Sequence, residues 1–257
     1  SYPYKGELVS KQGKLIYYKD LFYSDFLRFF VDRIVLTVPG YQKLFGIKVL
    51  YVPNGVEYDN KKVMPRINDD GGIHLLAVAS MSVWHGYDRI IRGFAEYYAA
   101  KNDVKIVLHL AGVGAELKRY KYLVKKHHLE KYVIFEGFCE GEKLNELYKK
   151  CHIGLGSLGV HRTWDGKVIS SLKLKEYASK GLPFVIEGIC DMEDDTTRKY
   201  ILRVPSDETP INISKIIDFC KSVYAENKAI NNMIKEEFRR YYDMDKLFEP
   251  VIDFLDS

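Results

Sequence analysis

The sequence of 257 residues has no Cys-x-x-Cys pair, the spacing that is typical of structural zinc sites. No secretory signal peptide is recognisable, so we expect a cytoplasmic protein whose thiols are reduced. The cysteines are instead widely spaced, at Cys139, Cys151, Cys190 and Cys220. We therefore expect no metal site built on cysteine.

Long apolar runs are missing too. No stretch approaches the roughly 20 apolar residues that cross a bilayer. The most aromatic stretch, 21–30, is interrupted by Asp25 and Arg28. Internal repeats and low-complexity segments are also absent. The composition, with 47% hydrophobic and 29% charged residues, is that of a globular protein with one large or two modest domains.

The net charge of +4 is mild. It argues against a dedicated nucleic-acid arm, and the basic residues form no stripe with interleaved aromatic residues. We expect no nucleic-acid partner. The charge is compatible with an anionic small ligand or with loose contact to an acidic membrane surface.

Apolar runs of strand length alternate with helical patterns, which predicts βαβ units and a parallel sheet. Two strands are expected early, at 33–38 and 48–52, and residues 57–72 are polar and typical of a linker. The regular part has strands at 73–79, 104–111, 133–136, 153–158 and 183–186, and helices at 87–100, 115–128, 142–150 and 172–180. The remainder from 211 is mostly helical in pattern. We predict an α/β fold with domains at 1–56 and 73–257.

Ligands of such sheets bind at the carboxyl ends of the strands. The loops at this edge are 80–86, 112–115, 137–141, 156–171 and the segment from 187 onward, and all five contain glycine. Glycine allows the backbone to approach a ligand closely. We therefore expect the binding site among these loops.

The stretch SSLKLKEYASKGLPFV, 170–185, combines a helix start with charged residues. Ser170 and Ser171 are favoured N-cap residues, and a helix N-terminus attracts anions. Lys173 adds a cation near the first turn, and Glu176 lies one turn further, where a carboxylate can accept ribose hydroxyls. A phosphate-plus-ribose site and an ordinary solvated helix are equally compatible with these residues alone.

Five motifs in order resemble GT-B glycosyltransferases of the family 4 type. The stretch 171–183 is similar to the helix of that family that binds the sugar donor, with the pattern K-L-x-E-Y-x-A-x-G-x-P. The others are VPNGV at 52–56, the strand, loop and helix at 75–91, LAGVG at 110–114 and VIFEGF at 133–138. Residues 2–4 and 31–35 also resemble the end of the acceptor domain in bacterial polysaccharide glycosyltransferases.

The resemblance implies a Rossmann-like parallel sheet flanked by helices, the C-terminal domain of a GT-B enzyme, preceded by a remnant of the acceptor domain. It implies transfer of a sugar from a UDP-type or GDP-type nucleotide sugar to a saccharide or lipid-linked acceptor, with retention, in bacterial surface polysaccharide synthesis. No metal or other cofactor is implied. The catalytic residues of the acceptor domain would lie before Ser1, so we expect a truncated form with poor activity.

The resemblance also implies a donor-binding set. Glu176 matches the ribose-binding glutamate of the family, whereas its partner glutamate falls on Val168, with Asp165 as a weaker replacement. The family's phosphate-clamping Arg and Lys fall on Ser80 and His85, so Arg162 and Lys173 become the candidate cations. The predicted donor-binding residues are Ser80, His85, Gly86, Gly114, Phe138, Arg162, Ser171, Leu172, Lys173 and Glu176.

Other interpretations stay open. A nucleotide-sugar epimerase shares the GT-B architecture, and the lost clamp residues favour a non-catalytic module that binds nucleotide sugars. We expect the basic and aromatic region 14–30 to form a packed helix of the acceptor domain. The alternative is that it makes peripheral contact with the anionic inner face of a membrane.

Overall fold

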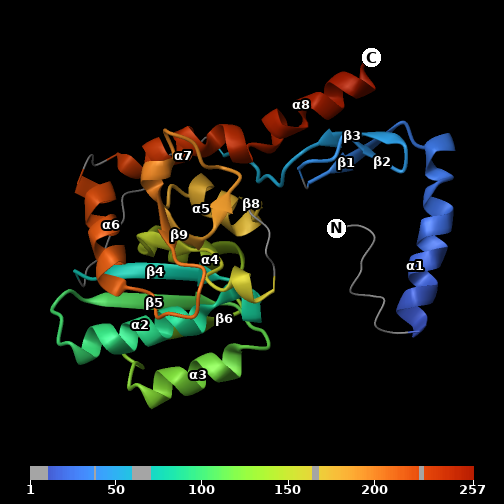
Figure 1. Ribbon diagram of the computed structural model, residues 1–257. Coiled ribbons are helices and arrows are strands. Elements are labelled where there is room, and N and C mark those ends of the chain that lie inside the picture. The colour runs from blue at the N-terminus through green and yellow to red at the C-terminus, as the bar shows by residue number, and fades with distance from the viewer. Residues whose placement is uncertain (1–10, 38, 60–70, 164–167, 226–228) are drawn as a thin grey trace. The chain divides into compact units, whose positions relative to one another are not determined.

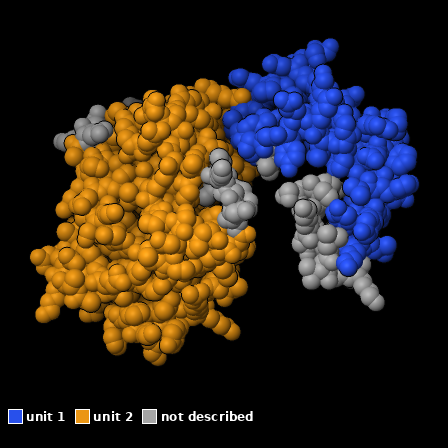
Figure 2. Space-filling model, in the orientation of Figure 1, with its two compact units in different colours: residues 1–53, 247–257 blue, residues 54–246 orange. Residues whose placement is uncertain are grey.

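A computed structural model describes residues 11–37, 39–59, 71–163, 168–225 and 229–257. The chain forms two compact units (Figure 2). One comprises 1–53 with 247–257, and the other comprises 54–246. The prediction from sequence instead kept the C-terminal residues with the larger domain and placed the first boundary at 56.

The first unit holds a small sheet in the order β1-β3-β2. Strand β1 (Arg33–Leu36) pairs in parallel with β3 (Ile47–Tyr51), which turns back on β2 (Lys43–Leu44). Both expected early strands are thus confirmed. The unit also contains α1 (Lys11–Ser24), η2 (Leu27–Phe29) and most of α8 (Met244–Leu255). Many apolar side chains between 15 and 30 are exposed, among them Phe30 at 84%.

The second unit is built on a six-stranded parallel sheet with the order β11-β9-β7-β4-β5-β6. The strands are β4 (Ile73–Val78), β5 (Ile106–Ala111), β6 (Val133–Gly137), β7 (Ile153–Leu155), β9 (Phe184–Glu187) and β11 (Ile201–Val204). A separate parallel pair joins β8 (Val168–Ile169) to β10 (Ile189–Cys190). The helices are η3 (Val83–His85), α2 (Tyr87–Ala99), α3 (Leu117–Lys126), α4 (Gly141–Lys150), η4 (Val160–Arg162), α5 (Leu172–Ser179), η5 (Arg198–Tyr200), α6 (Ile213–Ala225) and α7 (Ile230–Tyr242).

Helices cover both faces of this sheet (Figure 1). Successive strand residues point to opposite faces, so Leu75 joins the apolar cluster under α2, α3 and α6, while Leu76 joins the cluster under α4, α5 and α7. Because both faces are buried, the strands need continuous apolar sequence rather than alternation. The predicted α/β fold with a parallel sheet flanked by helices is confirmed.

Two features of the sheet were not predicted. Strand β11 occupies an edge beside β9. A polar line also crosses three neighbouring strands, because the Nδ1 of His74 lies 2.8 Å from the Nε2 of His109, whose own Nδ1 lies 2.7 Å from Glu136. Both histidines are buried, and burial lowers the pKa of His109.

Among the helices that the structure describes, none combines the length and the apolar character that crossing a bilayer requires.

Candidate functional site

The loops at the carboxyl edge of the sheet pack tightly on one another. A Cβ atom on Gly114 would lie 2.0 Å from the carbonyl oxygen of Ser80, and one on Gly112 would lie 1.9 Å from that of Ala79. Both glycines also have positive φ, which L residues with side chains rarely adopt. The loop after β5 therefore rests directly on the loop after β4, where Ser80 is exposed.

The loops after β4 and β7 are interlocked. The amide of Leu158 donates to the carbonyl of His85 at 2.9 Å, and that of Gly159 donates to Trp84 at 3.2 Å. Gly86, with φ of +61°, has the backbone of Leu158 and Gly159 within 2.6 Å of where its Cβ would stand. These contacts fix the entrance to α2 against η4.

His85 supplies no charge to this edge. Its side chain is buried, and its Nδ1 accepts a hydrogen bond from the amide of Ser82 at 2.9 Å. Burial and the nearby charge of Lys173 lower the pKa of His85 to about 3. The imidazole is therefore neutral at physiological pH, so His85 does not supply the positive charge that the resemblance led us to consider at this position.

Lys173 stands in the first turn of α5 and is half-buried. Its Nζ lies 3.4 Å from the hydroxyl oxygen of Tyr87 and 5.8 Å from the centre of that ring. No carboxylate pairs with it in the part of the chain that the structure describes. Burial without a counter-charge lowers the pKa of Lys173 to about 7. An anion at this position would restore its charge.

The start of α5 itself matches the prediction. Ser171 is the N-cap residue, in an extended conformation, but its side chain makes no capping hydrogen bond. The Ser170 hydroxyl is engaged elsewhere, donating to Asp191 at 2.7 Å. The amides of the first turn thus have no side-chain cap. Leu172, the first helical residue, is 51% exposed.

Glu176 lies one turn into α5 and lines a cavity of about 390 Å³. Its Oε2 accepts a hydrogen bond from the Tyr148 hydroxyl at 3.0 Å. The cavity lies between α4, α5 and the segment after Pro53, and is lined by Val56, Glu57, Asp59, Gly141, Leu144, Asn145, Tyr148, Glu176, Ser179 and Lys180. Phe138 follows β6 at the same edge of the sheet and is 68% exposed.

Arg162 lies at the carboxyl edge of the sheet, but carboxylates already pair with its charge. Its guanidinium bonds both oxygens of the buried Asp88, at 2.8 and 3.0 Å, and also binds Glu208 at 2.6 and 2.7 Å. These bonds raise the pKa of Arg162 well above its ordinary value. The adjacent His161 likewise lies between Glu187 and Glu208, at 2.9 and 3.0 Å. Of the two candidate cations, only Lys173 is left without a carboxylate partner among the described residues.

Several acidic residues of interest turn out to be structural. Sequence reasoning overlooked an Asp-x-Asp sequence at 243–245, but Asp243 is buried and accepts from Arg239 at 2.9 Å. Asp194 is held by Tyr241 and Arg240. Within the described ranges, no cluster of three histidine, cysteine or acidic residues is arranged to hold a metal ion. Asp165 and Asp69–Asp70 lie outside those ranges.

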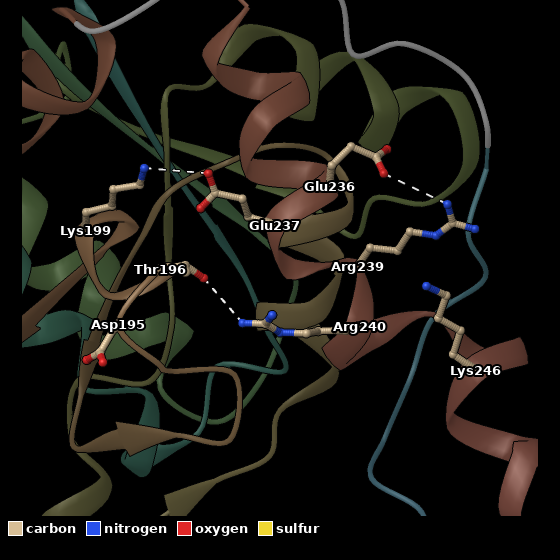
Figure 3. A pocket seen from close by; sticks show the side chains of 8 residues that line it. All are labelled: Asp195, Thr196, Lys199, Glu236, Glu237, Arg239, Arg240 and Lys246. Carbon is tan, nitrogen blue, oxygen red and sulfur yellow. Dashed lines mark hydrogen bonds and ion pairs between the residues drawn. The ribbon is translucent and has the colours of Figure 1, made fainter.

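A second cavity, of about 580 Å³, lies beside α7 (Figure 3). It mixes cations with carboxylates, and many of these are paired, such as Lys199 with Glu237 at 3.6 Å and Arg239 with Glu236 at 4.0 Å. The remaining lining residues are Asp195, Thr196, Arg240 and Lys246. None of these residues belongs to the loops that follow β4, β5, β6 or β7 at the carboxyl edge of the sheet. We therefore do not assign the nucleotide site to this cavity.

Comparison with known proteins found similarity to one family and to several solved structures. Residues 60–155 match the family model described as Glycosyl transferases group 1. This part of the chain is therefore similar to a group 1 glycosyltransferase domain. The matched stretch ends at β7, so Arg162, Lys173 and Glu176 lie beyond it. No curated protein matches the sequence.

The chain also resembles several solved structures. Anabaena HepE with UDP and glucose has a TM-score of 0.69 at 14% identity, over 98% of this chain and 69% of that chain. The pneumococcal O-GlcNAc transferase GtfA with UDP and GlcNAc has a TM-score of 0.63 at 16% identity, over 91% of this chain and 46% of that chain. A mutant of S. aureus TarM with fondaparinux, alpha-GlcNAc-glycerol and UDP has a TM-score of 0.64 at 13% identity, over 96% of this chain and 47% of that chain. The chain thus spans about half to two thirds of the length of these relatives, and the likeness establishes the GT-B fold.

Sequence reasoning missed two residues that contact the predicted set. Tyr148 holds Glu176, and Tyr87 lies against Lys173. Tyr148 lies on the same face of α4 as Gly141 and Leu144, which the helical spacing of seven and four residues could have indicated. That this face meets α5 requires the tertiary structure.

Proposed function

We propose that this chain binds a nucleoside diphosphate sugar and belongs to an enzyme that transfers the sugar to a saccharide or lipid-linked acceptor, with retention. Such an enzyme would serve bacterial surface polysaccharide synthesis at the cytoplasmic face of the membrane. The observation that carries the proposal is the pairing, on one short helix, of a cation with no carboxylate partner among the described residues and a carboxylate that lines a cavity. The cation can bind a diphosphate, and the carboxylate can accept hydrogen bonds from a ribose.

In this proposal the diphosphate lies at the N-terminus of α5. The uncapped first-turn amides and the Lys173 ammonium offer hydrogen bonds and positive charge to it. When the bond from the sugar to the diphosphate breaks, negative charge accumulates on the leaving group. Groups already oriented toward that charge stabilise the transition state more than water does.

The nucleoside would extend from the diphosphate toward α4. Glu176 would accept hydrogen bonds from the ribose hydroxyls, and Phe138, which is exposed at the end of β6, would offer an aromatic face to the base. UDP is the favoured nucleotide, because the HepE, GtfA and TarM structures each contain UDP.

A non-catalytic module that binds nucleotide sugars is the second candidate. The neutral His85 and the carboxylate-paired Arg162 favour it, since both weaken the clamp on the leaving diphosphate. Lys173 favours the enzyme. A cation that is costly to bury and has no counter-ion is expected where a ligand supplies the missing charge.

The test is calorimetric binding of UDP, GDP and ADP to the chain, to Glu176→Ala and to Glu130→Ala, an exposed glutamate that serves as the matched control. Binding is measured rather than turnover, because the chain spans only part of its relatives. We expect one nucleotide to bind the parent and Glu130→Ala alike and to bind Glu176→Ala at least tenfold more weakly, since hydrogen bonds to charged groups contribute about 1.5–3 kcal/mol. Binding of no nucleotide, or equal binding by Glu176→Ala, would refute the proposed site.

A further inference from the structure

The carboxylate of Glu176 is held on one side only. Its Oε2 accepts from the Tyr148 hydroxyl at 3.0 Å, and this is the one hydrogen bond that the carboxylate makes with the described residues. The carboxylate also lines the cavity of about 390 Å³ between α4 and α5. An ionised carboxylate has about four lone-pair positions. Most of its accepting capacity is therefore unused and available to a ligand.

Tyr148 is itself rigidly placed. It is 4% exposed, and its ring packs edge-on against Tyr177, with 6.2 Å between ring centres. The Tyr177 hydroxyl in turn accepts from the amide of Val78 at 3.0 Å and lies 3.2 Å from carbonyls of β4 and β7. Tyr148, whose hydroxyl holds Glu176, is thus connected to the middle of the sheet through its ring contact with Tyr177.

Burial, together with the neighbouring Tyr177 and Glu176, raises the pKa of Tyr148 well above its ordinary value. Its hydroxyl therefore keeps its proton and acts as the donor in the bond to the carboxylate. The terminal torsion of a glutamate is broad and loosely restrained by sterics alone. A fixed donor on one oxygen selects one orientation of the carboxylate plane, and the other oxygen makes no hydrogen bond to the described residues.

We propose that Tyr148 is a positioning residue that orients Glu176 to accept hydrogen bonds from the ribose, and so makes the site selective for ribonucleotides over deoxyribonucleotides. The inference rests on the proposed function, because it requires a nucleotide in the cavity at Glu176. It adds a residue from α4, and a substrate preference, to that site. Tyr148 does not touch the ligand in this scheme and acts through Glu176.

The test compares the binding of UDP and 2′-deoxy-UDP to the parent chain, Tyr148→Phe, Glu176→Ala and the double variant. Tyr122→Phe, which removes the hydroxyl of an exposed tyrosine on α3, is the matched control. The parent and the control should prefer UDP by about tenfold or more, as expected for a hydrogen bond to a charged group. In Tyr148→Phe the preference should fall to about threefold or less, while the affinity for 2′-deoxy-UDP stays within about twofold of the parent's.

The ratio of the affinity for UDP to the affinity for 2′-deoxy-UDP distinguishes a positioning role of Tyr148 from a purely structural one. A variant that merely loosens α4 would bind both nucleotides more weakly by the same factor and leave the ratio unchanged, and that result would overturn the inference. In the Glu176→Ala background, Tyr148→Phe should have no further effect on UDP affinity, because coupled residues are not additive. A further loss in the double variant would also overturn it.

Failure of the proposed function would look different. A parent chain that binds neither nucleotide, or a Glu176→Ala variant that keeps the full preference for UDP, would reject the ribose site and the role of Tyr148 with it. If Glu176→Ala abolishes the preference and Tyr148→Phe preserves it, the ribose site stands and only the role of Tyr148 is rejected.

Discussion

Replacing Lys173 by methionine should stabilise the empty protein. Burial lowers the Lys173 pKa from 10.5 to about 7, and each pH unit corresponds to about 1.4 kcal/mol between charged and neutral forms. The charged form is thus disfavoured by up to about 5 kcal/mol. Because the side chain is only half-buried, water screens the charge, and we expect Lys173→Met to gain about 2 kcal/mol at pH 6. Methionine fills a similar volume without a charge.

The gain should depend on pH in a fixed direction. Below about pH 7 the lysine is charged in both folded and unfolded chains, and the folded chain carries the whole penalty. Between about pH 7 and 10.5 the unfolded chain holds a proton that the folded chain has released, so the parent's stability rises with pH. The advantage of Lys173→Met should therefore be largest at pH 6 and should shrink by about 1 kcal/mol or more at pH 9.

Urea denaturation followed by tryptophan fluorescence measures this difference. Both tryptophans, Trp84 and Trp164, belong to the unit from 54 to 246, so the signal reports on the unit that contains Lys173. Lys125→Met, which removes an exposed lysine from α3, is the control and should change little at either pH. A Lys173→Met variant less stable than the parent at pH 6, or an advantage that does not shrink by pH 9, would refute the reasoning about desolvation.

The other predictions concern binding, packing and acid stability. Lys173→Met should weaken UDP binding about tenfold or more in calorimetry, whereas Arg162→Met should lower the free energy of unfolding by about 1–3 kcal/mol and change affinity less, because its charge is already paired. Gly112→Ala should lower the free energy of unfolding, measured by urea denaturation, by at least about 3 kcal/mol, because the new Cβ would meet a carbonyl oxygen. Gly141→Ala should lower it by only about 1–2 kcal/mol, because Gly141 also has a positive φ but has open space around it. Because the folded pKa of His109 is lowered, the parent should lose stability as pH falls below about 6.5, and His109→Gln should lose less in melting curves between pH 7 and 5.

The sequence allowed the central part of the fold to be predicted because its signals are local. Strands β4 and β5 are continuous apolar runs, and the helix with Glu176 is bounded by serines before it and by Lys-Gly-Leu-Pro after it. Strand β11 was missed because it is short and contains Arg203, as an edge strand can. Its place in the sheet comes from pairing with β9, which is a non-local property.

For the candidate site, the sequence shows the residue types but not their charge states. Arg162 looked like a phosphate ligand until its partners, Asp88 and Glu208, proved to come from 74 and 46 residues away. His85 looked partly charged until its burial was known. Pairing and desolvation both depend on which distant residues meet, and no local pattern specifies that.

The crossing of the loops after β4 and β7 has a consequence for how this site can evolve. Gly86 and Gly159 meet so closely that a Cβ on either would lie within 3 Å of the other's backbone. A larger residue at one position cannot be accommodated by a smaller residue at the other, because glycine already lacks a side chain. We expect related sequences to keep both glycines or to change both loops together. Exposed neighbours such as Val83 and Trp84 should vary among these sequences. If the proposed function is correct, new donor specificities should therefore arise at the loop tips, while the backbone at the start of α2 stays the same.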